Sequence, residues 1–217
     1  MKRRINPEET ARAQAYKLWM ASPMPMVTIT KTFDISPLVR YGKRHRKKLN
    51  MLLCHCIGMA AQQEQAFFLL PEKDGLYQYD SLALNVIVEN RQGGINSCDI
   101  PYSDHLEQFN NDYLRLTRQA VAECKSSFLE EQMIIGTSAL VQTELDSITN
   151  QYTELFKNPF LSWGKYRKHW FRYTLPISFQ FHHVQMDGMQ AAKFLEQLQK
   201  TIVDYRWVSD EGVSWKR

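Results

Sequence analysis

The sequence predicts an α/β protein of the α+β kind, in which helices flank a mixed β-sheet. Short runs typical of strands occur at 27–33, 82–89 and 172–182. Longer runs with helical periodicity lie between them, and 188–205 carries an apolar stripe at helical spacing. Because strands and helices do not follow a strict βαβ order, a mixed sheet is favoured over a purely parallel one.

The chain begins with a predicted helix and a predicted strand. Asn6 and Pro7 suit the cap and the first position of a helix, and Glu9 stands where a capping box places its acid. This helix is expected to run to about Leu18. The alternating stretch 27–33 is then expected to be a strand.

A second helix is expected to start at Ser36 and Pro37 by the same capping logic. The apolar segment 49–61 is long enough to be a buried helix, so we expect this helix to continue to about Gln65.

The rest of the chain alternates between strands and helices. Strands are expected at 76–79, 82–89, 95–100, 133–141 and 172–182, and helices from Ser103 to about Lys125 and from Gly188 to Tyr205. The stretch 146–168 is expected to be irregular because Pro159 and Gly164 interrupt it.

Length and composition favour one globular domain over residues 1–217. Hydrophobic residues make up 44% of the 217 residues, which is enough to form a substantial core. No linker rich in Pro, Gly or Ser divides the chain. The net charge of +4 is mild and does not demand a nucleic-acid partner.

The sequence offers no targeting, membrane or metal signal. The start, 1–7, is charged and lacks the apolar core of a secretory signal, and no apolar run approaches 18 residues. We therefore expect a cytoplasmic protein with no membrane partner. The four cysteines have neither disulfide-framework nor zinc spacing, and the neighbours in Cys54-His55-Cys56 would point about 100° apart on a helix. No metal is predicted.

The residues most suggestive of chemistry are His182-His183-Val184-Gln185-Met186-Asp187-Gly188, between a predicted strand and a predicted helix. A histidine at the end of a rigid strand is well placed to take a proton from a substrate, and its ordinary pKa of about 6.5 suits that work. A bare pair of histidines is also compatible with a purely structural role. The complete pattern His-x-x-x-Asp-Gly is more specific.

That pattern resembles the chloramphenicol acetyltransferase family, which transfers acetyl from acetyl-CoA to a hydroxyl. It also occurs in the acyltransferase cores of 2-oxo acid dehydrogenase complexes. The resemblance to the first family extends from about Arg12 to Trp207. Its landmarks appear in order at 28–35, 101–103, 107–109, 137–140, 146–147, 158–160, 164–166 and 175–178. It implies a two-layer sandwich of a mixed sheet and helices, assembled as a homotrimer with active sites between subunits.

The resemblance also implies the catalytic residues. His183 would be the general base that activates the acceptor hydroxyl, and Ser138 would stabilise the tetrahedral oxyanion. Asp187 would pair with Arg12 and hold the histidine loop in shape. From the residues alone, Ser138 could instead bond to backbone, and Arg12 could be a solvated residue on the first helix.

Contacts to acetyl-CoA are implied at Lys47 and Lys165, which match phosphate-binding lysines, and at Tyr166, which could cover the adenine. Ser162 stands where the family has a threonine that holds a water near the intermediate. The basic run 43–48 could instead be a solvated helix face. It could also contact nucleic acid, but it lacks the interleaved aromatic residues typical of such sites.

The acceptor pocket is where the chain departs from the family. The aromatic wall of the chloramphenicol enzymes is replaced by a methionine-rich segment, 19–27, and by smaller or more polar residues at Ile95, Ser97, Ile148 and Asn150. We expect acetyl transfer to chloramphenicol or a related small-molecule acceptor, of the kind that confers antibiotic resistance. Two alternatives stay open: an acyltransferase core that uses lipoyl thioesters, and a non-catalytic oligomeric relative.

Overall fold

The computed structural model describes residues 1–205; Trp207, the far end of the expected resemblance, lies outside them. The strands are β1 (Lys2–Ile5), β2 (Met26–Asp34), β3 (Leu69–Glu72), β4 (Gly75–Tyr79), β5 (Leu82–Glu89), β6 (Ile95–Pro101), β7 (Met133–Leu140), β8 (Phe160–Gly164), β9 (Arg167–His169) and β10 (Arg172–His182). The α-helices are α1 (Ala13–Met20), α2 (Ser36–His45), α3 (Leu49–Ala61), α4 (Leu106–Glu123) and α5 (Gly188–Asp204). Short 3-10 helices span Pro7–Glu9 and Gln65–Phe68.

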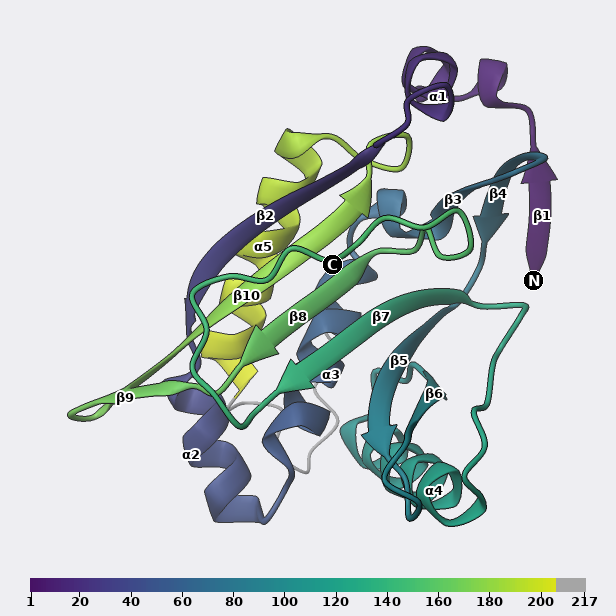
Figure 1. Cartoon of the computed structure of the whole chain (residues 1–217). Coiled ribbons are helices and arrows are strands. Elements are labelled where there is room, and N and C mark those ends of the chain that lie inside the picture. The colour runs from purple at the N-terminus through teal and green to yellow at the C-terminus, as the bar shows by residue number, and fades with distance from the viewer. Residues whose placement is uncertain (206–217) are drawn as a thin grey trace.

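The main sheet is mixed, as predicted. Its strands run in the order β2-β10-β8-β7-β5-β6, with β9 paired to β10 as a hairpin. β7 is parallel to both of its neighbours, and the other pairs are antiparallel. A separate three-stranded sheet, β1-β4-β3, stands beside the main one (Figure 1).

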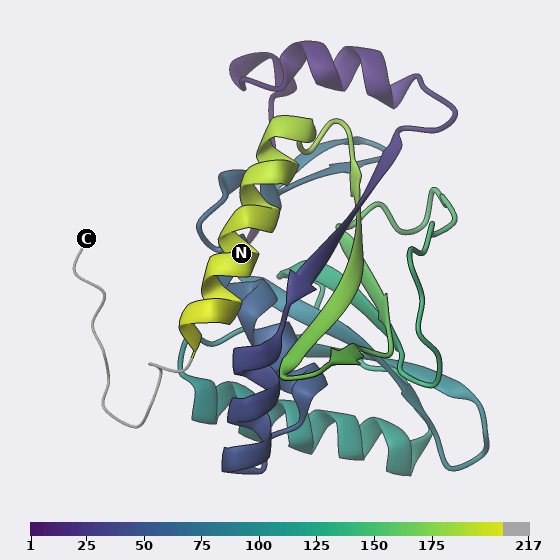
Figure 2. The same cartoon turned by 90° about the vertical axis from the view of Figure 1, so that its left-hand side faces the viewer.

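Helices α2, α3 and α5 cover one face of the main sheet, which gives the expected two layers (Figures 1 and 2). The alternation of β10 explains which face is covered. Ile177, Phe179 and Phe181 are fully buried in the core, and the Phe179 ring packs against Phe67 and Phe194. None of the helices in residues 1–205 is long and apolar enough to span a membrane.

The other face of the sheet carries a row of hydroxyl groups. Strand register places Thr30, Ser178, Ser162 and Ser138 side by side on β2, β10, β8 and β7. The segment 141–159 crosses this face on the side away from α5 (Figure 2). A hydrogen bond from the Ile148 amide to Ser178 Oγ, at 2.8 Å, attaches this segment to the sheet. The sheet therefore has one apolar face and one polar face.

The single helix expected from Asn6 to Leu18 was wrong. Asn6 does cap, accepting from the Glu8 amide, but the 3-10 turn ends at Thr10, whose backbone is extended. The Thr10 hydroxyl donates to the Pro7 carbonyl and accepts from the Arg12 amide, so side-chain bonds replace the helical ladder. The α1 helix therefore begins just after Arg12.

The single helix expected from Ser36 to Gln65 was also wrong. It is broken at Arg46, whose φ of 53° lies in the left-handed region. The Lys47 amide closes the end of α2 on the Gly42 carbonyl at 2.9 Å. The break turns α3 back into the core, where its long apolar segment is buried.

The stretch expected to be irregular contains β8, one of the central strands. Pro159 and Gly164 bound this strand rather than interrupt it, and pairing on both sides stabilises it. Gly164 is required there because a Cβ would lie 2.7 Å from the Thr143 carbonyl oxygen. Strands β1 and β3 were also not predicted.

Tight packing around Gly58 yields a stability prediction. A Cβ at Gly58 would lie 2.2 Å from the Tyr102 ring. Although Ala is the better helix former, Gly58→Ala should therefore destabilise the protein by about 1–3 kcal/mol. Gly188→Ala, where no atom lies within 4 Å of the added Cβ, is the control and should change stability by less than about 0.5 kcal/mol. Thermal unfolding measures both, and a higher melting temperature for Gly58→Ala would contradict the packing argument.

Candidate active site

His183 is the first residue after β10, and the structure fixes both its backbone and its ring. Its amide donates to the Pro25 carbonyl at 2.8 Å. Its ring stacks on Trp19 of α1, with the ring centroids 4.4 Å apart and the planes within 7° of parallel. Neither ring nitrogen bonds to a residue in the described part of the chain, and Nδ1 is buried. The imidazole is thus held in place while its ring nitrogens make no hydrogen bond to the described residues.

The Arg12 side chain holds the turn that carries His183. Its Nη2 donates to the His183 carbonyl at 2.7 Å, and its Nε donates to the Val184 carbonyl at 2.8 Å. Its Nη1 lies 3.3 Å from Asp187 Oδ2. The Arg12 side chain is only 13% exposed, so it is not the solvated residue that the sequence alone allowed. The structure brings Arg12, Asp187 and the His183 backbone together.

Asp187 is the N-cap of α5 as well as the partner of Arg12. Its Oδ1 accepts from the amides of Met189 and Gln190 at 3.0 and 3.2 Å, and the Gln190 side chain accepts from the Asp187 amide. The hydrogen bond from the Gln190 amide, followed by that from Met189 and the charge of Arg12, lowers the pKa of Asp187. The Asp187 carboxylate therefore joins Arg12 to the start of α5.

His182, by contrast, is a structural residue. It is almost fully buried on the polar side of β10, and its Nδ1 accepts from the Val184 amide at 3.1 Å. Burial, aided by the positive charge of Lys157, lowers its pKa to about 4. A neutral His182 therefore braces the same turn that Arg12 holds.

Ser138 does not meet His183 within one chain. It lies on β7 in register with Ser162 and Ser178, whereas His183 follows the end of β10. Ser138 is level with Ser178 but two strands away from it, and His182 follows Ser178 by four residues along β10. These two separations place Ser138 roughly 16 Å from His182. The half-buried Ser138 hydroxyl makes no hydrogen bond to a residue of the described chain. The two predicted catalytic groups therefore lie far apart within one chain.

Ser162 lies next to Ser138 but is 1% exposed. Its hydroxyl is within 3.4 Å of Asn150 Nδ2, so it joins the segment 141–159 to the sheet. A contact from Ser162 to a bound molecule remains a prediction.

The predicted CoA-binding residues lie around the end of α2 and the end of β8. Lys47 Nζ is paired with Glu107 at 2.7 Å and is largely enclosed. Lys165 is exposed just after β8, and Tyr166 packs edge-on against Tyr173 at 5.5 Å between centroids. Of the two lysines, only Lys165 has no acidic partner in the described residues.

The metal-like triplet Cys54-His55-Cys56 is part of the core. The two ring nitrogens of His55 bond to the Ser103 carbonyl and the Tyr205 hydroxyl, and burial lowers the pKa of His55 to about 4. Burial also raises the pKa of Cys54 to about 12. Within residues 1–205, no cluster of His, Cys, Asp or Glu has a geometry that could hold a metal ion.

The comparison that decides the family is a match over residues 3–199 to the model of the chloramphenicol acetyltransferase family. The chain belongs to this family. Membership makes it an acetyl-CoA-dependent acyltransferase, and the family takes acetyl-CoA as its co-substrate.

Individual relatives agree with the family. Chloramphenicol acetyltransferase 3 of Escherichia coli is 25% identical over 179 residues, which are 80% of this chain and 84% of that protein. A solved chloramphenicol acetyltransferase superposes with a TM-score of 0.79 at 20% identity, covering 93% of this chain and all of the other.

The acyltransferase cores have the same fold. The dihydrolipoamide acetyltransferase of Azotobacter vinelandii matches with a TM-score of 0.67 at 18% identity, covering 89% of this chain and 86% of that one. The cubic core of a pyruvate dehydrogenase complex matches at 0.65 and 18% identity, covering 90% and 88%.

Two signals for the site were missed in the sequence. Trp19 was predicted only as part of the wall segment 19–27, yet its ring forms the stacking surface for His183. Arg12 lies closer to the backbone carbonyls of His183 and Val184 than to the Asp187 carboxylate. A sequence pattern cannot reveal backbone acceptors, because every residue has a carbonyl.

The lowered pKa of Asp187 predicts a pH dependence of stability. A carboxylate with a depressed pKa stabilises the fold above its ordinary value of 3.8, and this contribution is lost as the pH falls through the folded-state pKa. Asp187→Asn should therefore be less stable than the unsubstituted protein at pH 7, and the difference should shrink below about pH 4. Urea unfolding at a series of pH values measures this.

The control is Asp204→Asn at the opposite end of α5. A negative charge there opposes the helix dipole, so its removal should leave stability unchanged or raise it slightly at pH 7. A constant Asp187→Asn difference from pH 3 to pH 7 would refute a role for the ionised carboxylate.

Proposed function

We propose that this protein transfers acetyl from acetyl-CoA to a hydroxyl of a small-molecule acceptor, with His183 as the general base. The observation that carries the proposal is the imidazole of His183, stacked on Trp19 and mounted on a turn that Arg12 holds, with no partner for its ring nitrogens among residues 1–205. A base must be rigidly positioned and free to accept a proton, and His183 meets both requirements.

The reaction would proceed by direct attack. Because Nδ1 is buried, Nε2 of His183 is the nitrogen that takes the proton from the acceptor hydroxyl. As the proton leaves, the hydroxyl oxygen bonds to the carbonyl carbon of the thioester. The Ser138 hydroxyl donates to the oxyanion that forms. The tetrahedral intermediate then collapses, the carbon–sulfur bond breaks, and the CoA sulfur leaves with the proton that His183 returns. The products are the acetyl ester and free CoA.

This chemistry requires two copies of the chain. Ser138 and His183 lie too far apart in one chain to act on the same carbon, so the base of one subunit must meet Ser138 of another. A ring of three subunits with head-to-tail contacts creates three such sites. We therefore propose a homotrimer with its active sites between subunits, as the resemblance implies.

The acceptor is proposed to be chloramphenicol or a related hydroxylated compound. Family membership and the Escherichia coli relative support chloramphenicol. The wall positions Ser97 and Asn150 are polar, which favours an acceptor with more hydrogen-bonding groups. A cytoplasmic location and a role in antibiotic resistance remain predictions from the sequence. The similar folds of the dihydrolipoamide acetyltransferases keep lipoyl thioesters as the alternative acyl donor.

The proposed base is tested by following free CoA from acetyl-CoA and chloramphenicol. His183→Ala should lower kcat/KM by at least about 100-fold, because it removes the only proton acceptor at the reacting oxygen. His105→Ala, at an exposed histidine, is the control and should retain full activity. Equal activity of the two variants would refute the mechanism. If CoA is released with other hydroxylated acceptors but not with chloramphenicol, the acceptor would be a different compound and the proposed reaction would still hold.

The intersubunit site predicts complementation between two inactive variants. His183→Ala and Ser138→Ala are mixed, unfolded and refolded together. Three quarters of randomly mixed trimers would contain one intact site in three, so activity should recover to about a quarter of normal. No recovery beyond the sum of the two separate variants would contradict a site shared between subunits.

A further inference from the structure

The turn that joins β9 to β10 consists of two exposed aromatic residues. Strand register pairs His169 of β9 with Arg172 of β10, so Trp170 and Phe171 form the turn between them. Trp170 is 89% exposed and Phe171 is 85% exposed. The hairpin projects beyond the other strands of the main sheet (Figure 1). We call Trp170 and Phe171 the hairpin tip.

The backbone of the hairpin tip is unfavourable for a large side chain. Trp170 has a φ of 53°, in the left-handed region that tight hairpin turns commonly fill with Asn or Gly. A bulky residue is disfavoured in that region, and a ring this exposed gains little from the core. Folding of the hairpin alone would therefore favour a residue such as Asn over Trp170.

Three cations surround the hairpin tip. Arg40 Nη1 donates to the Phe171 carbonyl at 3.4 Å. Lys43 Nζ lies 3.5 Å from the Tyr173 hydroxyl, and Lys168 stands opposite Tyr173 across the hairpin. All three cations are exposed. Within the described chain, no carboxylate pairs with any of them. We call Arg40, Lys43 and Lys168 the basic collar.

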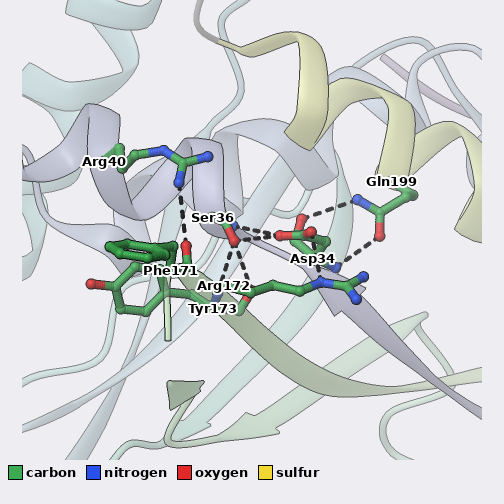
Figure 3. A network of polar contacts seen from close by, with 7 residues as sticks. All are labelled: Asp34, Ser36, Arg40, Phe171, Arg172, Tyr173 and Gln199. Atoms are coloured by element: carbon green, nitrogen blue, oxygen red, sulfur yellow. Dashed lines mark hydrogen bonds and ion pairs between the residues drawn. The ribbon is translucent and has the colours of Figure 1, made fainter. Parts of the chain in front are cut away.

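The base of the hairpin is rigidly mounted, as Figure 3 shows. The Tyr173 amide donates to Ser36 Oγ at 2.8 Å, and that hydroxyl donates to Asp34 Oδ1 at 2.6 Å. Arg172 Nε donates to Asp34 Oδ2 at 2.9 Å, and Gln199 of α5 bonds both the amide and the carbonyl of Asp34. These contacts join β2, α2, α5 and the hairpin, so the two rings are held out at a fixed position.

A projecting pair of rings with cations behind it is complementary to an anionic lipid surface. The rings can enter the apolar boundary below the headgroups, while lysine and arginine side chains stay level with the phosphates. A second copy of the chain would bring the same positive charge to the contact. Single-stranded nucleic acid is typically bound along a groove, whereas these rings lie on a projecting turn.

We propose that the hairpin tip and the basic collar bind an anionic lipid surface, with the rings of the tip below the headgroups and the collar on the lipid phosphates. Such a contact needs no membrane-spanning segment, because only the tip enters the lipid. The proposal does not rest on acetyl transfer, and it adds a peripheral attachment to the proposed reaction.

The test is cosedimentation of the full chain with vesicles of phosphatidylcholine that contain or lack phosphatidylglycerol. Trp170→Asn should weaken binding to the anionic vesicles at least about tenfold, because it removes an inserted ring. The same variant should melt no lower than the unsubstituted protein, because Asn tolerates a positive φ better than Trp does. Phe128→Asn is the control, because this 68% exposed ring lies beside β6, at the opposite edge of the main sheet. It should bind as the unsubstituted protein does.

The basic collar is tested in the same assay. Lys168→Gln should weaken binding to the anionic vesicles about fivefold, and added salt should reduce the difference. Lys125→Gln is the matched control, because it removes the same charge from an exposed lysine just after α4. It should leave vesicle binding unchanged.

Three results would overturn the proposal. The first is no binding to the anionic vesicles, or binding that is equal with and without phosphatidylglycerol. The second is equal vesicle binding by Trp170→Asn and the unsubstituted protein. The third is a different occupant of the tip. A change of oligomeric state in Trp170→Asn would identify a second copy, and loss of oligothymidylate binding in that variant would identify nucleic acid.

Discussion

The guanidinium of Arg12 joins the start of the chain to the turn between β10 and α5, and the rest of the site depends on that junction. It gives a donor to two backbone carbonyls and to the carboxylate that caps α5. Carbonyls enclosed in a tight turn are costly to leave unpaired, so the Arg12 side chain at the start of α1 stabilises the turn. Docking of α1 also brings Trp19 against His183. One contact thus couples the start of α5, the turn and the orientation of the imidazole.

A second constraint comes from the two-residue period of the strands. On β10 the same alternation that buries Ile177 and Phe179 against the helices places Ser178 in the hydroxyl row on the opposite face. Ser138 is held in its place by the register of β7 and β8, and a one-residue shift of that register would turn the apolar side chains of the shifted strand to the wrong face. A single chain therefore holds Ser138 and His183 apart, and in the proposed mechanism it is the association of subunits that would bring them together.

Sequence patterns were reliable where periodicity and a strong local signal agreed. The strands β2, β5 and β10, the helix α5 and the His-x-x-x-Asp-Gly turn were all predicted at nearly their observed positions. The failures share a physical cause. Thr10 and Arg46 break helices through local hydrogen bonds and a left-handed backbone, and β8 is stabilised by neighbours distant in sequence. The contacts of the basic run were equally hidden, because Lys47 pairs with Glu107, which lies sixty residues away, whereas Lys43 contacts Tyr173 beside the hairpin.

The proposed base and the predicted acceptor wall belong to different parts of the molecule. The proposed base His183 is mounted on a turn, whereas the predicted wall position Ser97 lies on strand β6. There Asn85 Nδ2 of β5 donates to Ser97 Oγ at 2.6 Å and to Asp99 Oδ1 at 2.5 Å. Asp99 is 3% exposed and also accepts a hydrogen bond from the Leu129 amide, so buried contacts hold Asn85 and Ser97 in place. On β7, Gly136 leaves room for the Phe160 ring to lie across the sheet. Substitution at such strand positions changes the wall without touching the turn that Arg12 holds, so acceptor preference can diverge within this fold while acyl transfer is retained.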